Sequence, residues 1–210
     1  MAERLYFYTN GEVVRSQTAS FEWFAGFAVS QKQKSIASFH DMIRIRGKKP
    51  LEISTKSPVP LGVKMSAFNL KLDGITLECV FQSSKVFEHG GPYTDLLEKS
   101  PKDAKRDERL RSSGELTGFR YQGMDWALRP TTAFYDYIYY QAIRQTLSEE
   151  ELKELIEYDA FTDIEFNDRK SRNTQARSAA LVCTVYRMNG KLPEMTPEEF
   201  LECHKKIVRG

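Results

Sequence analysis

The chain of 210 residues is 40% hydrophobic and 12% aromatic, so it is long and apolar enough to bury a core and is not intrinsically disordered. Its 31 basic and 29 acidic residues give a formal net charge of +2, which excludes the strongly basic surface of a nucleic-acid coat protein and leaves room for a local basic patch. Cys79, Cys183 and Cys203 have no metal-ligand spacing, and their odd number disfavours a disulfide framework. Since we find neither a signal-peptide-like run nor about 18 consecutive apolar residues, we expect a soluble cytoplasmic protein.

The predicted elements mix short strands with helices. Residues 1–30 carry apolar and aromatic runs that indicate strands or irregular chain, and Ser30 is expected to cap a helix that extends to Ile45. A strand over residues 51–55 and a hairpin over residues 68–77, which turns at Asp73-Gly74, should follow. Helices are then predicted at 77–89, 98–113, 131–143, 148–157, 176–188 and from 196 onward, with polar irregular chain at 158–173. The fold class is therefore α+β, a helix-rich single domain with a small β-sheet or hairpin.

Four polar side chains share one face of the helix predicted at 77–89. At about 100° per residue, Glu78, Gln82, Lys85 and His89 lie within roughly 60° of one another. In a pocket, Glu78 and Lys85 can hold opposite protonation roles, and a partly desolvated lysine becomes a nucleophile towards a carbonyl or an anomeric carbon. The alternative interpretation is a solvated amphipathic helix with an exposed ion pair.

An acidic segment follows at residues 159–168. Asp159, Asp163 and Glu165 alternate there with apolar residues. Such a density of oxygens can bind Mg²⁺ or Ca²⁺, but the spacing and the glycine of an EF-hand are missing. The acids could instead accept hydrogen bonds from ribose hydroxyls, or the segment is a polar loop that caps neighbouring helices.

Other side chains have both a functional and a structural interpretation. Trp126 can stack on a base or a ribose, or belong to the core. Asn173 precedes a predicted helix whose N-terminus could meet a phosphate. Glycine-rich phosphate-binding signatures are absent, since Gly90-Gly91-Pro92 lacks their spacing. His40 and His204 are expected to be structural or solvated.

Read together, these segments resemble the NADAR (YbiA-like) family, which is associated with NAD and ADP-ribose metabolism. Its helix motif E-H-x-[FY]-Q-x-x-K is similar to Glu78-x-x-Phe81-Gln82-x-x-Lys85, which follows Asp73-Gly74 here. The resemblance covers residues 61–188, from a segment similar to the family's L-S-N-F entry, with Ala67 where Asn is usual, to a helix that ends at Arg187. The chain departs from the family at 162–163, where Thr-Asp replaces Trp-Gly, and at 167–170, where Asn-Asp-Arg-Lys replaces a glycine-rich turn.

The whole sequence is most similar to a divergent branch paired with DarT-type DNA ADP-ribosyltransferase toxins. The resemblance implies an antitoxin that acts as an ADP-ribosyl hydrolase, an N-glycosidase that removes ADP-ribose from guanine bases in single-stranded DNA. It implies ADP-ribose as product, a cognate DarT-type toxin as partner, and no metal or cofactor. It also implies an N-terminal extension at 1–60, a catalytic domain at 61–190 and a C-terminal helix at 191–210.

The resemblance assigns roles to individual residues. Glu78 would stabilise positive charge on the sugar or shuttle a proton, and Lys85 would attack the anomeric carbon through a ring-opened imine. Asp159 and Asp163 would hold ribose hydroxyls or orient water. Substrate contacts are expected from Ser66, Phe68, Gln82, Trp126, Glu165 and Asn173. The basic side chains at the N-terminus are expected to contact DNA phosphates, or else to line a solvated helix: Lys32, Lys34, Arg44 and Arg46, with Lys48 and Lys49.

Two other functions remain open from the sequence. The same N-glycosidase chemistry could act on a small ribosylated metabolite, such as an intermediate of riboflavin synthesis. Alternatively, the protein could neutralise the toxin by binding it, or by binding ADP-ribose, without hydrolysis.

Overall fold

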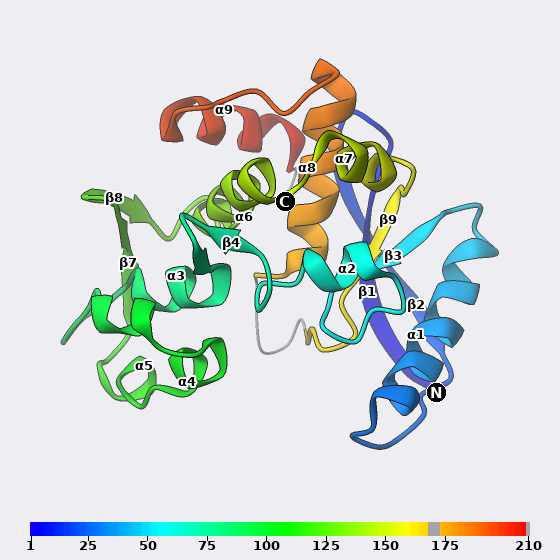
Figure 1. Cartoon of the computed structure of the whole chain (residues 1–210), viewed down its shortest axis with the longest axis horizontal. Helices are drawn as coiled ribbons and strands as arrows, with labels where there is room; N and C mark the ends of the chain where they lie inside the picture. The colour runs from blue at the N-terminus through cyan, green and yellow to red at the C-terminus, as the bar shows by residue number, and fades with distance from the viewer. Residues whose placement is uncertain (168–172, 209–210) are drawn as a thin grey trace. The chain divides into compact units, whose positions relative to one another are not determined.

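A computed structural model describes residues 1–167 and 173–208. It confirms a helix-rich α+β fold with small sheets (Figure 1). By their contacts the residues form two compact units, a first unit of Met1–Ser66 with Leu147–Gly210 and an inserted unit of Ala67–Thr146. The extent of the catalytic domain, expected at 61–190, stays a prediction.

A four-stranded sheet with the strand order β2-β1-β9-β3 forms the centre of the first unit. Its strands are β1 (Ala2–Thr9), β2 (Val14–Phe21), β3 (Pro50–Glu52) and β9 (Ala160–Thr162). Strand β1 pairs antiparallel with β2 and with β9, whereas β9 pairs parallel with β3. The last strand in the chain therefore occupies an inner position of the sheet.

Helices cover both faces of this sheet (Figure 1), α1 (Val29–Arg44) on one face and α8 (Gln175–Asn189) on the other. Alternate side chains of β1 point to opposite faces. Tyr6 packs with Phe39 of α1 in a buried apolar cluster, while the Thr9 hydroxyl accepts a hydrogen bond of 2.7 Å from Thr184 of α8. Further helices of this unit are α2 (Pro60–Lys64), α7 (Glu149–Ile156) and α9 (Pro197–Ile207).

Several local predictions for the first unit are confirmed and others are wrong. Helices α7 and α9 start after Ser148 and Thr196, as expected, and each start has a capping box. Ser30 does not cap α1, because the helix already starts at Val29. The segment 158–173 is not wholly irregular, since β9 lies within it. A strand of three residues has too short a pattern to be recognised, and its hydrogen bonds come from strands far away in the sequence. The departure from the family at 168–170 lies outside the described residues.

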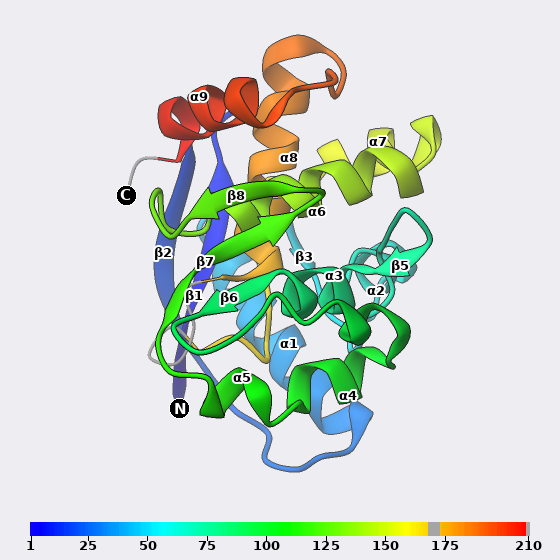
Figure 2. The ribbon, with the colours of Figure 1, turned by 90° about the vertical axis from the view of Figure 1, so that its left-hand side faces the viewer.

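The inserted unit contains two small sheets. The hairpin of β4 (Lys71–Leu72) and β5 (Ile75–Thr76) turns at Asp73-Gly74, as predicted, and both turn residues have positive φ. A three-stranded antiparallel sheet has the order β6-β7-β8 (Figure 2). Its strands are β6 (Lys85–Phe87), β7 (Leu116–Tyr121) and β8 (Met124–Ala127). The helices are α3 (Leu77–Ser83), the 3-10 helix η1 (Thr94–Glu98), α4 (Pro101–Arg106), α5 (Arg109–Ser112) and α6 (Ala133–Thr146).

The helix predicted at 77–89 is wrong in its second half. Helix α3 ends at Ser83, and Lys85 begins β6. The hydroxyls of Ser83 and Ser84 both donate to the carbonyl of Val80, at 3.0 and 2.7 Å, and so compete with helical hydrogen bonds. Pairing with β7 then satisfies the backbone from Lys85 onward. Lys85 and His89 therefore do not share a helix face with Glu78 and Gln82.

In the part of the chain that the structure describes, we find no helix with the length and apolar character needed to cross a bilayer.

Candidate functional site

Glu78 is held at the first turn of α3 by backbone contacts. The helix has no side-chain cap. Instead, the amide of Leu77 donates to the carbonyl of Leu70 at 2.8 Å, and the amide of Glu78 donates to the carbonyl of Ala67 at 2.9 Å. Residues 67–70 thus satisfy N–H groups that every helix start leaves free. These contacts fix the backbone of Glu78 at the start of the helix. Glu78 is buried there, with only 5% of the residue exposed.

Gln82 lies one turn further along α3 and is also buried. Its Nε2 donates a hydrogen bond of 2.9 Å to Oε1 of Glu78. Its carbonyl oxygen Oε1 is buried and has no hydrogen-bond partner among the described residues. Buried polar atoms are almost always paired, so this acceptor is suited to a hydroxyl or an N–H of a ligand.

Lys85 reaches the same side of the inserted unit from β6. Its Nζ lies 4.8 Å from the centroid of the Phe81 ring of α3. On the neighbouring strand Lys85 is paired with Phe119, a residue that itself packs on Phe81. Lys85 and Phe119 therefore share the face of the sheet that is turned towards α3.

Burial lowers the pKa of Lys85 to about 8, because desolvation disfavours the ammonium form. The Glu78 carboxylate acts against this effect and the Lys105 ammonium adds to it. Near neutral pH a useful fraction of Lys85 is thus the free amine, the form in which a lysine is a nucleophile.

Lys105 is a member of this site that the sequence did not reveal. It belongs to α4, within the charge-rich segment 98–113. Its Nζ lies 3.7 Å from Oε1 of Glu78 and 5.3 Å from the centroid of the Phe68 ring. No sequence signal connects α4 with α3, because their proximity arises only in the folded unit.

Gly91 sets the backbone of Lys85 in place. It has a φ of +85°, and a Cβ at this position would lie 2.3 Å from the carbonyl oxygen of Lys85. Only glycine allows the turn after β6 to pack this closely against the strand.

Trp126 and His89 lie outside this group of side chains. Trp126 is 6% exposed, and its ring packs 4.8 Å from Tyr137 and 5.5 Å from Phe134 between ring centroids. This packing is that of a core residue of the inserted unit. His89 is exposed in the turn after β6.

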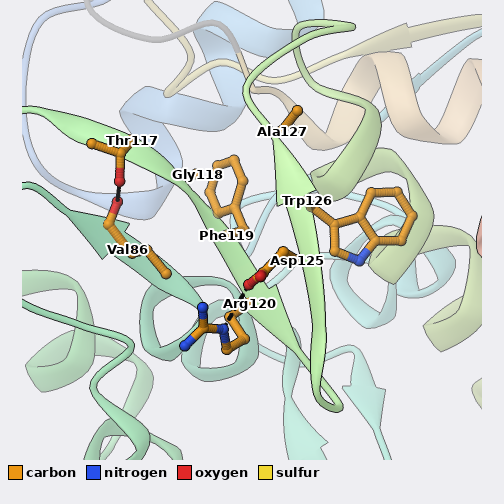
Figure 3. Close-up of a pocket in the computed structure, with 8 residues that line it drawn as sticks. All are labelled: Val86, Thr117, Gly118, Phe119, Arg120, Asp125, Trp126 and Ala127. Atoms are coloured by element: carbon orange, nitrogen blue, oxygen red, sulfur yellow. Dashed lines mark hydrogen bonds and ion pairs between the residues drawn. The ribbon is translucent and has the colours of Figure 1, made fainter.

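A hollow of about 440 Å³ lies over the three-stranded sheet (Figure 3). In Figure 3 Arg120 and Asp125 point towards one another across β7 and β8, where Arg120 Nε donates to Asp125 Oδ1 at 2.6 Å. The register places this pair on the sheet face opposite to Phe119 and Lys85. The hollow is lined by Val86, Thr117, Gly118, Phe119, Arg120, Asp125, Trp126 and Ala127. Neither Glu78 nor Lys85 lines it.

The predicted acids of the first unit make local contacts. Oδ1 of Asp159 accepts a hydrogen bond of 2.7 Å from the Lys49 amide. Asp163 accepts hydrogen bonds from the Glu165 amide and from Gln175 Nε2, each at 3.1 Å. Burial, followed by the nearby Glu52, raises the pKa of Asp163 to about 7. Burial thus favours the protonated form of Asp163.

Next to Asp163 lies a buried hydrogen-bond network that the sequence did not predict. Glu52 is fully buried and accepts hydrogen bonds from the Thr162 hydroxyl at 2.5 Å and from the Ile164 amide at 2.9 Å. His40 Nε2 lies 2.8 Å from the same hydroxyl. Burial raises the pKa of Glu52 and lowers that of His40 to about 3, so burial disfavours the charged form of both groups. This network connects α1, β3 and β9, and its residues come from three separate segments of the sequence.

The remaining predicted residues of the first unit are dispersed. Lys32 pairs with Glu165 at 3.2 Å, Arg44 donates to Asp41 at 2.8 Å, and Arg46 donates to the Thr18 carbonyl at 2.9 Å. Lys34 is exposed on α1, about 200° around the helix from Lys32. Ser66 is buried with a hydroxyl that lacks a partner among the described residues, and Asn173 directly precedes Thr174, the N-cap of α8.

Within residues 1–167 and 173–208, His, Cys, Asp and Glu side chains form no group of three or more that could hold a metal ion.

Fold and site together define a mixed α+β protein whose inserted unit holds a partly buried amine and a buried carboxylate that interact electrostatically. The chain belongs to the family of DarT1-associated NADAR antitoxins, whose model matches residues 2–209. This confirms the resemblance seen in the sequence and supports an antitoxin role in a DarT system, with a DarT-type toxin as its counterpart. A comparison with curated proteins finds no match.

Proposed function

We propose that the protein is an N-glycosidase that removes ADP-ribose from guanine bases in single-stranded DNA and so reverses the action of a DarT-type toxin. One observation carries the proposal: the Lys85 amine, with a pKa of about 8, lies 4.8 Å from the centroid of the Phe81 ring of α3, and the Glu78 carboxylate of the same helix is near enough to act on that pKa. A neutral amine next to a carboxylate provides a nucleophile and a group that stabilises positive charge on a sugar.

In the proposed reaction, the free amine of Lys85 attacks C1″ of the ribose. The bond between C1″ and the guanine nitrogen breaks, and the Glu78 carboxylate takes a proton from the attacking nitrogen and passes it to the leaving base. The ribose ring opens to an imine between C1″ and Nζ. Water adds to the imine carbon, the C1″–Nζ bond breaks, and ADP-ribose and the free amine are released. One water is consumed in total.

The other side chains of the inserted unit support this chemistry. Glu78 stabilises the positive charge that develops on the sugar during cleavage. The unpaired Oε1 of Gln82 accepts a hydrogen bond from a ribose hydroxyl. The face of the Phe81 ring attracts a cation, and so favours the positively charged iminium form over neutral alternatives. Phe68 contributes an apolar wall.

Roles for the first unit are proposed from the family resemblance alone. Asp159 and Asp163 remain candidates for holding ribose hydroxyls or orienting water, and Ser66, Glu165 and Asn173 for substrate contacts. Lys32, Lys34, Arg44 and Arg46 remain candidates for phosphate contacts.

The decisive assay compares single-stranded DNA that is ADP-ribosylated on guanine with DNA that is ADP-ribosylated on thymine, and separates the products by chromatography. We expect release of ADP-ribose from guanine only. Lys85→Ala and Glu78→Gln should lose at least 100-fold of this activity, on the order expected for a nucleophile and a general acid. Lys71→Ala, which removes an exposed lysine of the same unit, serves as the control.

Borohydride added during turnover should reduce the imine and leave ADP-ribose covalently attached at Lys85, as read by mass spectrometry. Full activity of Lys85→Ala would refute the proposed site. Turnover of a small ribosylated metabolite without action on DNA would refute the substrate. Tight binding of ADP-ribose or of the toxin without hydrolysis would refute the enzyme.

A further inference from the structure

Glu78 interacts electrostatically with two lysines from different elements. Lys85 comes from β6, and Lys105 comes from α4 with its Nζ 3.7 Å from Oε1 of Glu78. The two lysines differ in their surroundings, since Lys85 is partly buried whereas the Lys105 side chain is 57% exposed. Glu78 therefore pairs with a solvent-exposed amine and acts electrostatically on a second amine that is partly buried.

The charged groups around Lys85 are few. Among the described residues, Glu78 on α3 and Lys105 on α4 are the charges that act on it. The other side chains against it, Phe81 of α3 and Phe119 of β7, are uncharged. Any control of the protonation of Lys85 by neighbouring charge thus passes through Glu78 and Lys105.

We propose that Lys105 is a positioning residue that pairs with Glu78 and thereby prevents Glu78 from holding Lys85 as an ammonium ion. The carboxylate alone would stabilise the protonated, unreactive form of Lys85. An additional cation at the carboxylate offsets that attraction, and it also repels a proton on Lys85 directly. Both effects favour the free amine. The inference rests on the proposed function insofar as it treats Lys85 as the reacting amine.

Phe68 helps to keep Lys105 in this position. The Lys105 Nζ lies 5.3 Å from the centroid of the Phe68 ring, so the ammonium has an aromatic face on one side and the Glu78 carboxylate within ion-pair distance. Both contacts require a long side chain with a positive charge. Arginine at this position can make them, whereas an uncharged residue of similar size cannot.

The test measures the pKa of Lys85 without relying on activity. Competitive labelling with acetic anhydride between pH 6 and 10, followed by mass spectrometry, gives the fraction of free amine at each lysine. We expect Lys105→Met to raise the pKa of Lys85 by about 0.5, because Lys105 is solvent-exposed and exposed pairs are weak. Lys105→Arg should retain the wild-type value. Lys102→Met, an exposed lysine of the same helix, should also leave it unchanged.

The hydrolase assay adds a second readout. The kcat of Lys105→Met should fall about 3-fold at pH 7, in step with the free-amine fraction, and return to the wild-type value near pH 10. An unchanged pKa of Lys85 would overturn the inference. So would a rise in KM that is equal at all pH values, since that would make Lys105 a binding group for substrate phosphate. A shifted pKa in a protein without hydrolase activity would refute the proposed function while leaving the electrostatic role of Lys105 intact.

Discussion

The Nζ atom of Lys85 lies 4.8 Å from the centre of the Phe81 ring, although Phe81 belongs to helix α3 and Lys85 to strand β6. The chain therefore folds back on itself directly after Ser83, and the strand carries the lysine over the aromatic ring. The amine is therefore partly shielded from water, and it lies over the face of an aromatic ring.

The pKa of Lys85 predicts the pH dependence of the reaction. Burial, the largest effect, lowers this pKa to about 8, and the reactive species is the deprotonated amine. The kcat of ADP-ribose release should therefore rise with pH, about tenfold per unit well below pH 8, and level off above it. Initial rates between pH 5.5 and 10 check this expectation. A rate that is flat across this range would contradict a lysine nucleophile.

Replacement of Phe81 should cost stability as well as activity. The ring packs on Phe119, Phe134 and Tyr135, so Phe81→Leu leaves unfilled space and removes aromatic contacts. We expect a loss of about 1–3 kcal/mol in the free energy of unfolding, measured by urea denaturation.

The control for this prediction is Phe27→Leu, because Phe27 is fully exposed. That change should stay within about 0.5 kcal/mol of the wild type. Equal stability of the two variants would mean that Phe81 is not part of a packed core.

Gly91 offers a sharper test of how Lys85 is placed. Gly91→Ala adds a Cβ that would lie 2.3 Å from the Lys85 carbonyl oxygen, at a residue with a φ of +85°. The strand must move, so we expect a loss of more than about 2 kcal/mol in stability and a large loss of activity.

Gly74→Ala separates the two causes. Gly74 also has a positive φ, +80°, but a Cβ there meets no atom within 4 Å. It should cost only the backbone strain of about 1 kcal/mol and leave activity unchanged. If both variants behaved alike, close packing at Gly91 would not matter.

Asp163 should make the stability of the first unit depend on pH. Its pKa in the folded protein is raised to about 7, mainly by burial and then by Glu52, whereas in the unfolded chain it is near 3.9. Between these values the unfolded chain loses its proton first. The free energy of unfolding should therefore fall as pH rises from about 4 to 7, and then level off.

Asp163→Asn should remove part of this decline, on the order of 2 kcal/mol at pH 8. The difference between variant and wild type should be smallest at pH 3.5, where the carboxyl is protonated in both states. Denaturation curves at several pH values provide the measurement. A difference that does not change with pH would show that Asp163 has the same pKa in the folded and the unfolded chain.

Local rules explain which elements the sequence could predict. The turn at Asp73-Gly74 and the helix starts at Ser148 and Thr196 depend on neighbouring residues, and the structure has all three. Glu78 and Gln82, one helical turn apart, were correctly placed on one face of α3. By contrast, β6 and β9 are short strands whose partners lie far away in the sequence, so their patterns were mistaken for helix and for irregular chain.

The candidate site shows the same limit. Lys85 was expected beside Glu78 as part of a continuous helix, and it lies near Glu78 through a strand that turns back. The position of Lys105 beside Glu78, and the hydrogen-bond network of His40, Thr162 and Glu52, both arise from contacts between separate segments. A lysine in a charge-dense helix and a glutamate in a buried strand have no local pattern that distinguishes them.

The order in which the chain is synthesised has a consequence for how the protein is built. The inserted unit is one uninterrupted segment, Ala67–Thr146, while the sheet of the first unit lacks an inner strand until Ala160–Thr162 has left the ribosome. During translation the unit that carries Glu78 and Lys85 can thus complete its own contacts before the first unit can close its sheet. Until then, strands β1 and β3 have no strand between them, and we expect chains that stall before residue 160 to be the ones most exposed to aggregation and proteolysis.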